Sequence, residues 1–150
     1  MQPLPHTYHV SVEADVAGDV TVAAPGLPSF PSASPPEFDG PGGRWSPESL
    51  LCSAAASCFI LTFRAVARAS KFDWRHLSCQ VEGTLERKDG ATQFTRMVTH
   101  AVLKVDGATD LATAQRLLEK AERGCLIANS LKAERVLTTD IQTQYSANGD

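Results

Sequence analysis

The sequence lacks the features that mark several common functional classes. It has no cluster of lysine or arginine and a formal net charge of −3, so it has no basic surface for nucleic acid or an anionic membrane. The N-terminus, Met-Gln-Pro-Leu-Pro-His, has neither a basic start nor an apolar run, so no signal peptide is expected. These absences favour a cytoplasmic protein that acts on neither nucleic acid nor a membrane.

The spacing of the four cysteines also excludes a common kind of site. Positions 52, 58, 79 and 125 form no Cys-x-x-Cys pair, and no histidine accompanies a cysteine pair. Structural zinc sites need such spacing, so we expect no bound metal. In the cytoplasm the four thiols would stay reduced unless they carry out redox chemistry.

What is present indicates one ordinary domain. The 150 residues are 43% hydrophobic and 21% charged, which are globular values, and no repeat or linker divides residues 1–150. Alternating and turn-forming residues predict a hairpin at 8–23, strands near 77–83 and 92–105, and a closing strand near 136–143. Residues 24–45 are rich in proline and glycine and are predicted to be a loop that forms no strand ladder. A second helix is predicted from Asp110, and residues 146–150 are predicted to form a frayed tail. The predicted class is α+β.

Residues 46–70 form the most distinctive stretch. Ser46 is a good N-cap, Pro47 suits the first helical position, and Glu48 lies at the positive end of the helix dipole. No charged residue occurs from Ser49 to Phe63, which predicts a helix buried in a core. This uncharged run is shorter than the ~20 residues that a membrane span needs.

The four thiols differ in their predicted positions. Alternation puts Cys79 on the inward face of a strand, where a cysteine is most simply a small hydrophobic residue. Cys52 and Cys58 lie about 120° apart around one helix and do not share a face. Cys125 lies on the apolar face of the second helix. If the two helices pack together, Cys58 and Cys125 can meet. Spacing alone leaves two alternatives open, a redox pair or buried inert thiols.

Two motifs resemble a known family. Ser-Pro-Glu-Ser-Leu-Leu at 46–51 runs into Ala-Ala-Ala-Ser-Cys-Phe at 54–59, and Gly-Cys-Leu-Ile-Ala-Asn-Ser-Leu follows at 124–131. Together they resemble the signature of the OsmC/Ohr family of peroxidases, and the order of elements matches over nearly the whole chain. The resemblance implies antiparallel sheets packed around a long buried central helix, in an intertwined homodimer with active sites at the subunit interface.

The resemblance also implies a chemistry. It implies a thiol peroxidase that reduces organic hydroperoxides, and sometimes hydrogen peroxide, in oxidative-stress defence without a metal or flavin cofactor. By motif position Cys58 would be the peroxidatic thiol and Cys125 the resolving thiol, with a Cys58–Cys125 disulfide as intermediate. A dithiol such as a lipoyl protein or a thioredoxin-like protein would reduce that disulfide.

The family also places an arginine, held by a glutamate, beside the peroxidatic thiol, and Glu48 matches that glutamate. Ten residues correspond to ~15 Å along a helix, so Glu48 would reach a Cys58 of a second subunit. Residues 8–40 contain no arginine or lysine, whereas typical members carry the arginine near the first hairpin. Arg44 is the nearest replacement in sequence, with Arg64 and Arg96 as further candidates. This departure keeps two alternatives, a non-catalytic homologue that binds a small apolar ligand in the dimer pocket and a structural dimer with inert thiols.

Overall fold

The computed structural model describes residues 1–144 of the chain, so the predicted tail at 146–150 lies outside the described residues. The chain divides into two compact units, Met1–Leu51 and Cys52–Asp150.

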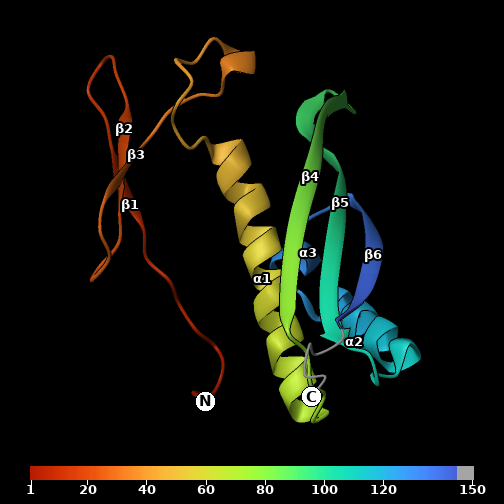
Figure 1. Cartoon of the computed structure of the whole chain (residues 1–150). Coiled ribbons are helices and arrows are strands. Elements are labelled where there is room, and N and C mark those ends of the chain that lie inside the picture. Colours follow the sequence, from red (N-terminus) through yellow and green to blue (C-terminus); the bar gives the residue numbers. More distant parts are fainter. Residues whose placement is uncertain (145–150) are drawn as a thin grey trace. The chain divides into compact units, whose positions relative to one another are not determined.

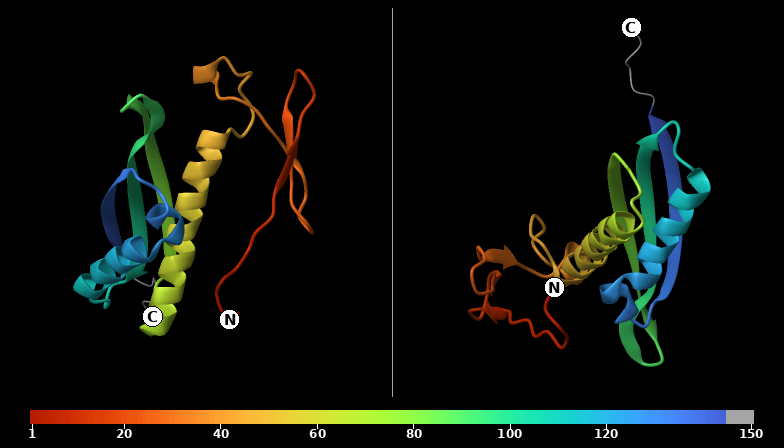
Figure 2. Two further views of the ribbon diagram at one scale, coloured as in Figure 1. Left: turned by 180° about the vertical axis from the view of Figure 1, so that it is seen from behind. Right: turned by 90° about the horizontal axis from the view of Figure 1, so that it is seen from below.

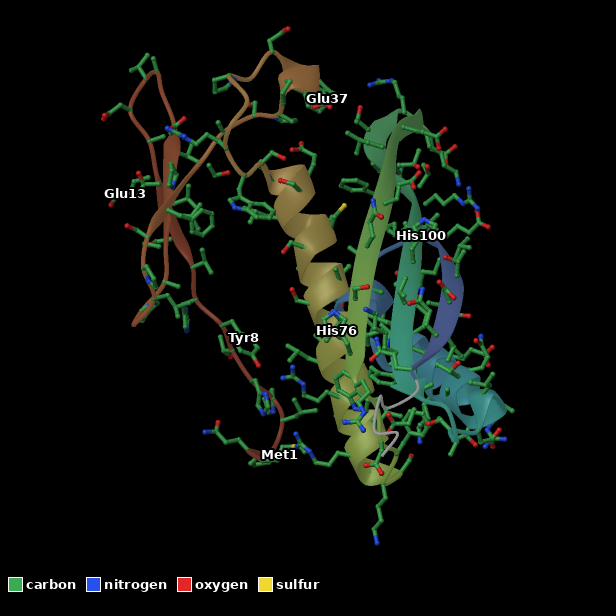
Figure 3. All side chains as sticks on the ribbon, in the orientation of Figure 1. Met1, Tyr8, Glu13, Glu37, His76 and His100 are labelled. Carbon is green, nitrogen blue, oxygen red and sulfur yellow. The ribbon has the colours of Figure 1, made fainter. Side chains whose placement is uncertain are left out.

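The first unit contains a small antiparallel sheet. Its strands are β1 (Ser11–Glu13), β2 (Val20–Ala23) and β3 (Phe30–Ser32), in the order β1-β2-β3, and a short 3-10 helix η1 (Pro36–Phe38) follows. Figure 3 labels Glu13 on β1 and Glu37 on η1. The β1–β2 pair confirms the hairpin predicted at 8–23.

The prediction that the Pro/Gly-rich segment 24–45 forms no strand ladder is wrong. Strand β3 lies in this segment and pairs with β2, with Pro31 opposite Thr21. Proline has no N–H to donate, but an edge strand tolerates it because one side of the strand needs no partner within the sheet. β3 is an edge strand of this sheet, which is why the proline is compatible with it.

Helix α1 (Pro47–Ala69) begins at the predicted proline. Ser49 N–H donates to Ser46 Oγ at 3.1 Å, and Ser46 N–H donates to Ser49 Oγ at 2.9 Å. These reciprocal bonds satisfy backbone donors at the start of the helix, as a capping box does. The local sequence therefore accounts for the first turn of α1 and places Glu48 in it.

The second unit is built on one three-stranded sheet. Its strands are β4 (His76–Lys88), β5 (Ala91–Asp106) and β6 (Glu134–Gln144), in the order β4-β5-β6 (Figure 1). Strands β4 and β5 are antiparallel and are joined by the predicted Asp89-Gly90 turn, in which both residues have positive φ angles. His76 on β4 and His100 on β5 are labelled in Figure 3.

One pairing in this sheet differs from the prediction of antiparallel sheets. β6 runs parallel to β5 over its whole length. Helices α2 (Leu111–Gly124) and α3 (Leu126–Asn129) lie between these strands in sequence. They carry the chain back to the end of the sheet where β5 began, and such a crossover joins parallel strands.

The helices cover one face of this sheet (Figure 2). Residues of β5 that point to this face are buried, whereas their neighbours in sequence are partly exposed. A single core cluster joins α1, β4, β5 and α2; its buried members are Phe59, Phe63, Ala67, Leu77, Ala101, Leu103, Val105, Ala114, Leu117, Leu118 and Ala121. Both α1 and α2 therefore pack on the same side of the sheet.

Helix α1 is buried along one stripe rather than all round. Its buried residues, Ala55, Phe59, Phe63 and Ala67, recur every four positions, and Leu61 remains 57% exposed. By length and composition α1 is the one helix among residues 1–144 that could cross a membrane, with 22% of its most apolar window buried. A core helix of a soluble protein passes the same test, and the buried stripe packs against the chain's own sheet.

Candidate active site

Cys58 lies in the middle of α1, close to the corner between α2 and α3. Its Sγ is 3.9 Å from Oγ1 of Thr62, one helical turn further along α1. The side chain is partly buried, and the thiol is free. A partly buried, unpaired thiol beside hydrogen-bond donors is a candidate nucleophile.

Cys125 occupies the corner itself. It is the C-cap of α2 and the N-cap of α3, with an extended backbone (φ −66°, ψ 103°), and it is 1% exposed. Its thiol donates a hydrogen bond to the carbonyl oxygen of Ala55 on α1 at 3.8 Å. The predicted break before Cys125 therefore places the thiol against α1, next to the turn that carries Cys58.

The structure places Cys58 and Cys125 close enough that each alters the pKa of the other, and the two pKa values shift in opposite directions. Burial by itself would raise the pKa of Cys58. Backbone N–H groups of Ile127 and Leu126 and the side chains of Cys125 and Thr62 outweigh it, so that the pKa of Cys58 is lowered. Hydrogen bonds to the thiolate favour the charged form.

Cys125 has the opposite shift. Burial raises its pKa, and the neighbouring Cys58 and the carboxylate of Glu122 raise it further, against a lowering bond from the Ala128 N–H. One thiol of the pair is therefore the better nucleophile, and the other is held protonated. A lowered pKa favours the thiolate that can attack a peroxide oxygen and become a sulfenic acid, and a second thiol beside it can condense with that sulfenic acid to a disulfide.

The other two cysteines pack in the core as predicted. Cys79 lies on the inward side of β4 against the main core cluster, and burial raises its pKa to about 11. Cys52 packs in a second cluster with Met97, and its Sγ would lie only 2.9 Å from a Cβ atom at Gly83. Burial raises the pKa of Cys52 as well.

Glu48 lies in the first turn of α1, ten residues and ~15 Å of helix before Cys58. Its Oε2 atom is buried and accepts no hydrogen bond from residues 1–144. A buried carboxylate oxygen without a partner is costly, and a cation is the usual solution.

The three arginines considered as that cation differ in position. Arg44 forms an ion pair with Asp19, with Nε 2.8 Å from Oδ2, and also donates to the carbonyl oxygen of Gly43. Arg64 and Arg96 are exposed on α1 and β5. Arg44 therefore already has a carboxylate partner within the first unit.

Several groups around Cys58 were not found from the sequence. The N–H groups of Leu126 and Ile127 are backbone atoms, so no residue pattern identifies them. Thr62 follows Cys58 by four positions, which is the spacing of neighbours on a helix, and this signal was available. The sequence pointed to arginines as the groups that lower the pKa of Cys58, because a charged residue is easier to recognise in a sequence than a backbone donor.

An ion pair holds the α2–α3 corner. Arg135 Nε donates to Glu122 Oε1 at 2.9 Å, and its Nη1 donates to Asn129 Oδ1 at 2.5 Å. The Arg135 and Glu122 side chains are 25% and 15% exposed. One guanidinium thus links the start of β6 to the end of α2 and to α3, on either side of Cys125. Among residues 1–144 no group of three or more His, Cys, Asp or Glu side chains is arranged to hold a metal ion.

Comparison with known proteins identifies the family. The family model described as OsmC-like protein matches residues 40–140, which is more than half of the chain and includes α1, both strands of the long hairpin and the Cys125 corner. The chain belongs to the OsmC-like protein family. This confirms the resemblance that the two cysteine motifs indicated.

Relatives and solved structures agree with this assignment. The OsmC-like chain is 33% identical over 101 residues to the uncharacterized protein YmaD of Bacillus subtilis, covering 65% of this chain and 67% of YmaD. It is 28% identical over 105 residues to peroxiredoxin OsmC of Escherichia coli, covering 70% and 71% of the two chains. The structure of an OsmC-like protein of unknown function from Vibrio cholerae superposes with a TM-score of 0.83 at 18% identity, covering 91% of this chain and all of that one. The chain therefore has the α+β fold of OsmC-like proteins.

Proposed function

We propose that this OsmC-like protein is a thiol peroxidase that reduces organic hydroperoxides, with Cys58 as the peroxidatic thiol and Cys125 as the resolving thiol. The observation that carries the proposal is the pairing of these two free thiols, one with a lowered and one with a raised pKa. The relationship to a protein named peroxiredoxin OsmC supports the same chemistry.

The reaction balances with these residues and a dithiol. The Cys58 thiolate attacks the terminal oxygen of the hydroperoxide, the O–O bond breaks, and the alkoxide takes a proton and leaves as an alcohol. Cys58 is thereby oxidised to a sulfenic acid. The Cys125 sulfur displaces its hydroxyl, which leaves as water, and a Cys58–Cys125 disulfide forms. An external dithiol, of the lipoyl or thioredoxin-like class, reduces this disulfide by exchange.

Apolar side chains near the two cysteines support an organic hydroperoxide, rather than hydrogen peroxide, as the substrate. Leu61, three positions after Cys58, and Leu126, directly after Cys125, are exposed apolar side chains. An alkyl group binds best against such apolar side chains. Neither a metal nor a flavin is needed for the proposed steps, since the two thiols carry all the electrons.

We also propose that a second copy of the chain completes the site. The face of α1 opposite its buried stripe is apolar and exposed in the single chain, as at Leu61. Glu48 has a buried oxygen without a partner, and ~15 Å of helix separates it from Cys58 of its own chain. An intertwined homodimer would cover the apolar face and offer Glu48, with Arg44 as the proposed cation, to the partner's thiol. We place this dimer in the cytoplasm.

The test is the consumption of cumene hydroperoxide and tert-butyl hydroperoxide with dihydrolipoamide as reductant. We expect turnover by the wild-type protein and none above the reductant background for Cys58→Ser. The matched control is Cys52→Ser, which changes the other thiol of α1 and should retain activity. Wild-type protein that consumes neither hydroperoxide would contradict the proposal.

The missing arginine near the first hairpin favours a second candidate, a non-catalytic homologue that binds a small apolar ligand in the dimer pocket. The same experiment separates the two. A dimer that binds an apolar fluorescent probe with saturation, consumes no hydroperoxide and leaves Cys58 reduced after peroxide treatment would favour the ligand-binding protein. Full turnover by a monomer would contradict the proposed completion of the site by a second subunit.

A further inference from the structure

Thr62 is placed to act directly on the Cys58 sulfur. The two residues are four positions apart on α1 and therefore lie on the same face of the helix. Oγ1 of Thr62 is 3.9 Å from Sγ of Cys58, within the range of a hydrogen bond to sulfur. Thr62 is partly buried at this position.

The direction of this hydrogen bond follows from the state of the thiol. A protonated thiol can donate to the threonine oxygen or accept from it. A thiolate has no proton and can only accept, so the threonine hydroxyl becomes the donor once Cys58 is deprotonated. A donor of this kind stabilises the thiolate more than the thiol.

Gly124 restricts the orientation of Thr62. A Cβ atom built on Gly124 would lie 3.3 Å from the Thr62 Cγ2 methyl, so this methyl lies near residue 124 and a side chain there would crowd it. A β-branched side chain has few χ1 rotamers, and contact on the methyl side selects among them. The packing that seats the methyl on Gly124 leaves the hydroxyl directed at Cys58.

We propose that Thr62 is a catalytic residue of this site, whose hydroxyl donates a hydrogen bond to the Cys58 thiolate. This bond stabilises the thiolate, as a neighbouring cation would. The inference rests on the proposed function for the role of Cys58 as nucleophile. Thr62 is also one of the groups that lower the pKa of Cys58, together with the N–H groups of Ile127 and Leu126 and the Cys125 thiol, against the raising effect of burial. Glu122 and Cys79 are further titratable groups close to Cys125: the Glu122 carboxylate raises the pKa of Cys125, and Cys125 contributes to raising the pKa of Cys79.

The experiment measures the pH dependence of Cys58 alkylation by isotope-coded iodoacetamide in the full chain. Fragment ions of peptide 45–64 separate Cys58 from Cys52. In Thr62→Val, which keeps the shape and removes the donor, we expect alkylation at pH 6–7 to slow by roughly three- to tenfold, because hydrogen bonds to charged groups are the stronger ones. At a pH above the pKa of both proteins the rates should converge.

Three variants accompany this measurement. Thr62→Ser keeps the hydroxyl but lacks the methyl that orients it, so its alkylation rate should lie between those of Thr62→Val and the wild type. Thr62→Ala lacks the donor, should behave like Thr62→Val, and provides the measurement if the valine variant does not fold. Ser57→Ala removes an exposed hydroxyl one residue before Cys58 and should change nothing. Slow labelling of Cys79 in peptide 76–87 reports that each variant is folded.

Two results would overturn the proposal. Wild-type alkylation rates for both Thr62→Val and Thr62→Ala at pH 6–7 would show that the hydroxyl does not act on the thiolate. Equal slowing in Thr62→Ser and Thr62→Val would show that the hydroxyl does not set the rate, because serine keeps the donor that valine lacks. Alkylation needs no hydroperoxide, so a role for Thr62 can be established even if the protein proves to have no peroxidase activity, and the two proposals fail separately.

Discussion

Cys58 and Cys79 belong to the same compact unit and are both partly buried, yet their surroundings shift the two thiol pKa values in opposite directions. Cys79 faces the apolar core from a position near the start of β4, where burial raises its pKa to about 11. Cys58 meets the same penalty of burial, but the start of α3 and the Thr62 hydroxyl supply donors that lower its pKa.

The comparison shows that burial alone does not decide in which direction a thiol pKa shifts. Backbone N–H groups at the start of a helix lack partners within that helix, and they favour a nearby anion. The central strand β5, in contrast, uses its backbone N–H groups in hydrogen bonds to its neighbouring strands. Few backbone donors are therefore free to reach Cys79 on the adjacent strand β4. The donors that matter belong to the irregular corner between α2 and α3, and Cys58 is the thiol that this corner reaches.

The largest expected difference is in turnover. Cys125→Ser should reduce multiple turnover of cumene hydroperoxide to background, because the Cys58 sulfenic acid then has no resolving thiol. Cys79→Ser should retain turnover close to wild type. Dimedone labelling of Cys58 after peroxide treatment should increase in Cys125→Ser. Loss of turnover in Cys79→Ser with Cys125→Ser unaffected would reverse the assignment of the pair.

The next difference is in alkylation rate. At pH 7 the Cys79 thiolate is scarce, since its pKa is about 11, whereas the Cys58 pKa lies below the ordinary thiol value of 9.0. Below both pKa values the thiolate fraction falls tenfold per unit, so Cys58 should be alkylated at least ~100-fold faster than Cys79. The Cys58 rate should level off first as pH rises. Equal rates for the two thiols in folded protein would break the comparison.

A smaller effect is expected at Cys52, the packing thiol of α1. A Cβ atom on Gly83 would lie 2.9 Å from Cys52 Sγ, 2.9 Å from Phe94 Cε1 and 3.1 Å from Met97 Sδ. Gly83→Ala should therefore lower the free energy of unfolding by about 1–3 kcal/mol, as overpacking does. Adding Cys52→Ala should restore part of the loss. Urea denaturation measures both, and full wild-type stability of Gly83→Ala would show that this packing is loose.

The last prediction, with an effect on stability of similar size, tests the corner itself. Arg135→Met removes the guanidinium that joins Glu122 to Asn129 and leaves a half-buried carboxylate without its partner. We expect a loss of about 1–3 kcal/mol in the free energy of unfolding. The matched control, Arg75→Met, breaks the exposed pair with Asp106 and should cost less than ~1 kcal/mol. A loss for Arg135→Met no greater than that for Arg75→Met would show that the corner does not depend on this ion pair.

Much of the local structure could be predicted from short sequence patterns. The Ser-Pro-Glu start of α1, the Asp89-Gly90 turn and the Asp110 cap depend on residues within one or two turns of each other, and all three are observed. The pairing of β6 parallel to β5 was missed because alternation gives the faces of a strand, not its direction. The strand β3 was missed because the sequence does not show that Pro31 would lie at an edge.

The family, the two cysteine motifs and the helix that carries Cys58 could be predicted from the sequence, because they depend on residue identity and spacing along the chain. The surroundings of the Cys58 sulfur depend on how the chain folds. The groups that lower the pKa of Cys58 come from α1 and from residues some seventy positions away, and two of them are backbone N–H groups, which every residue except proline carries. A sequence pattern therefore cannot single out these N–H donors, and the folded α2–α3 corner is needed to show which thiol they face.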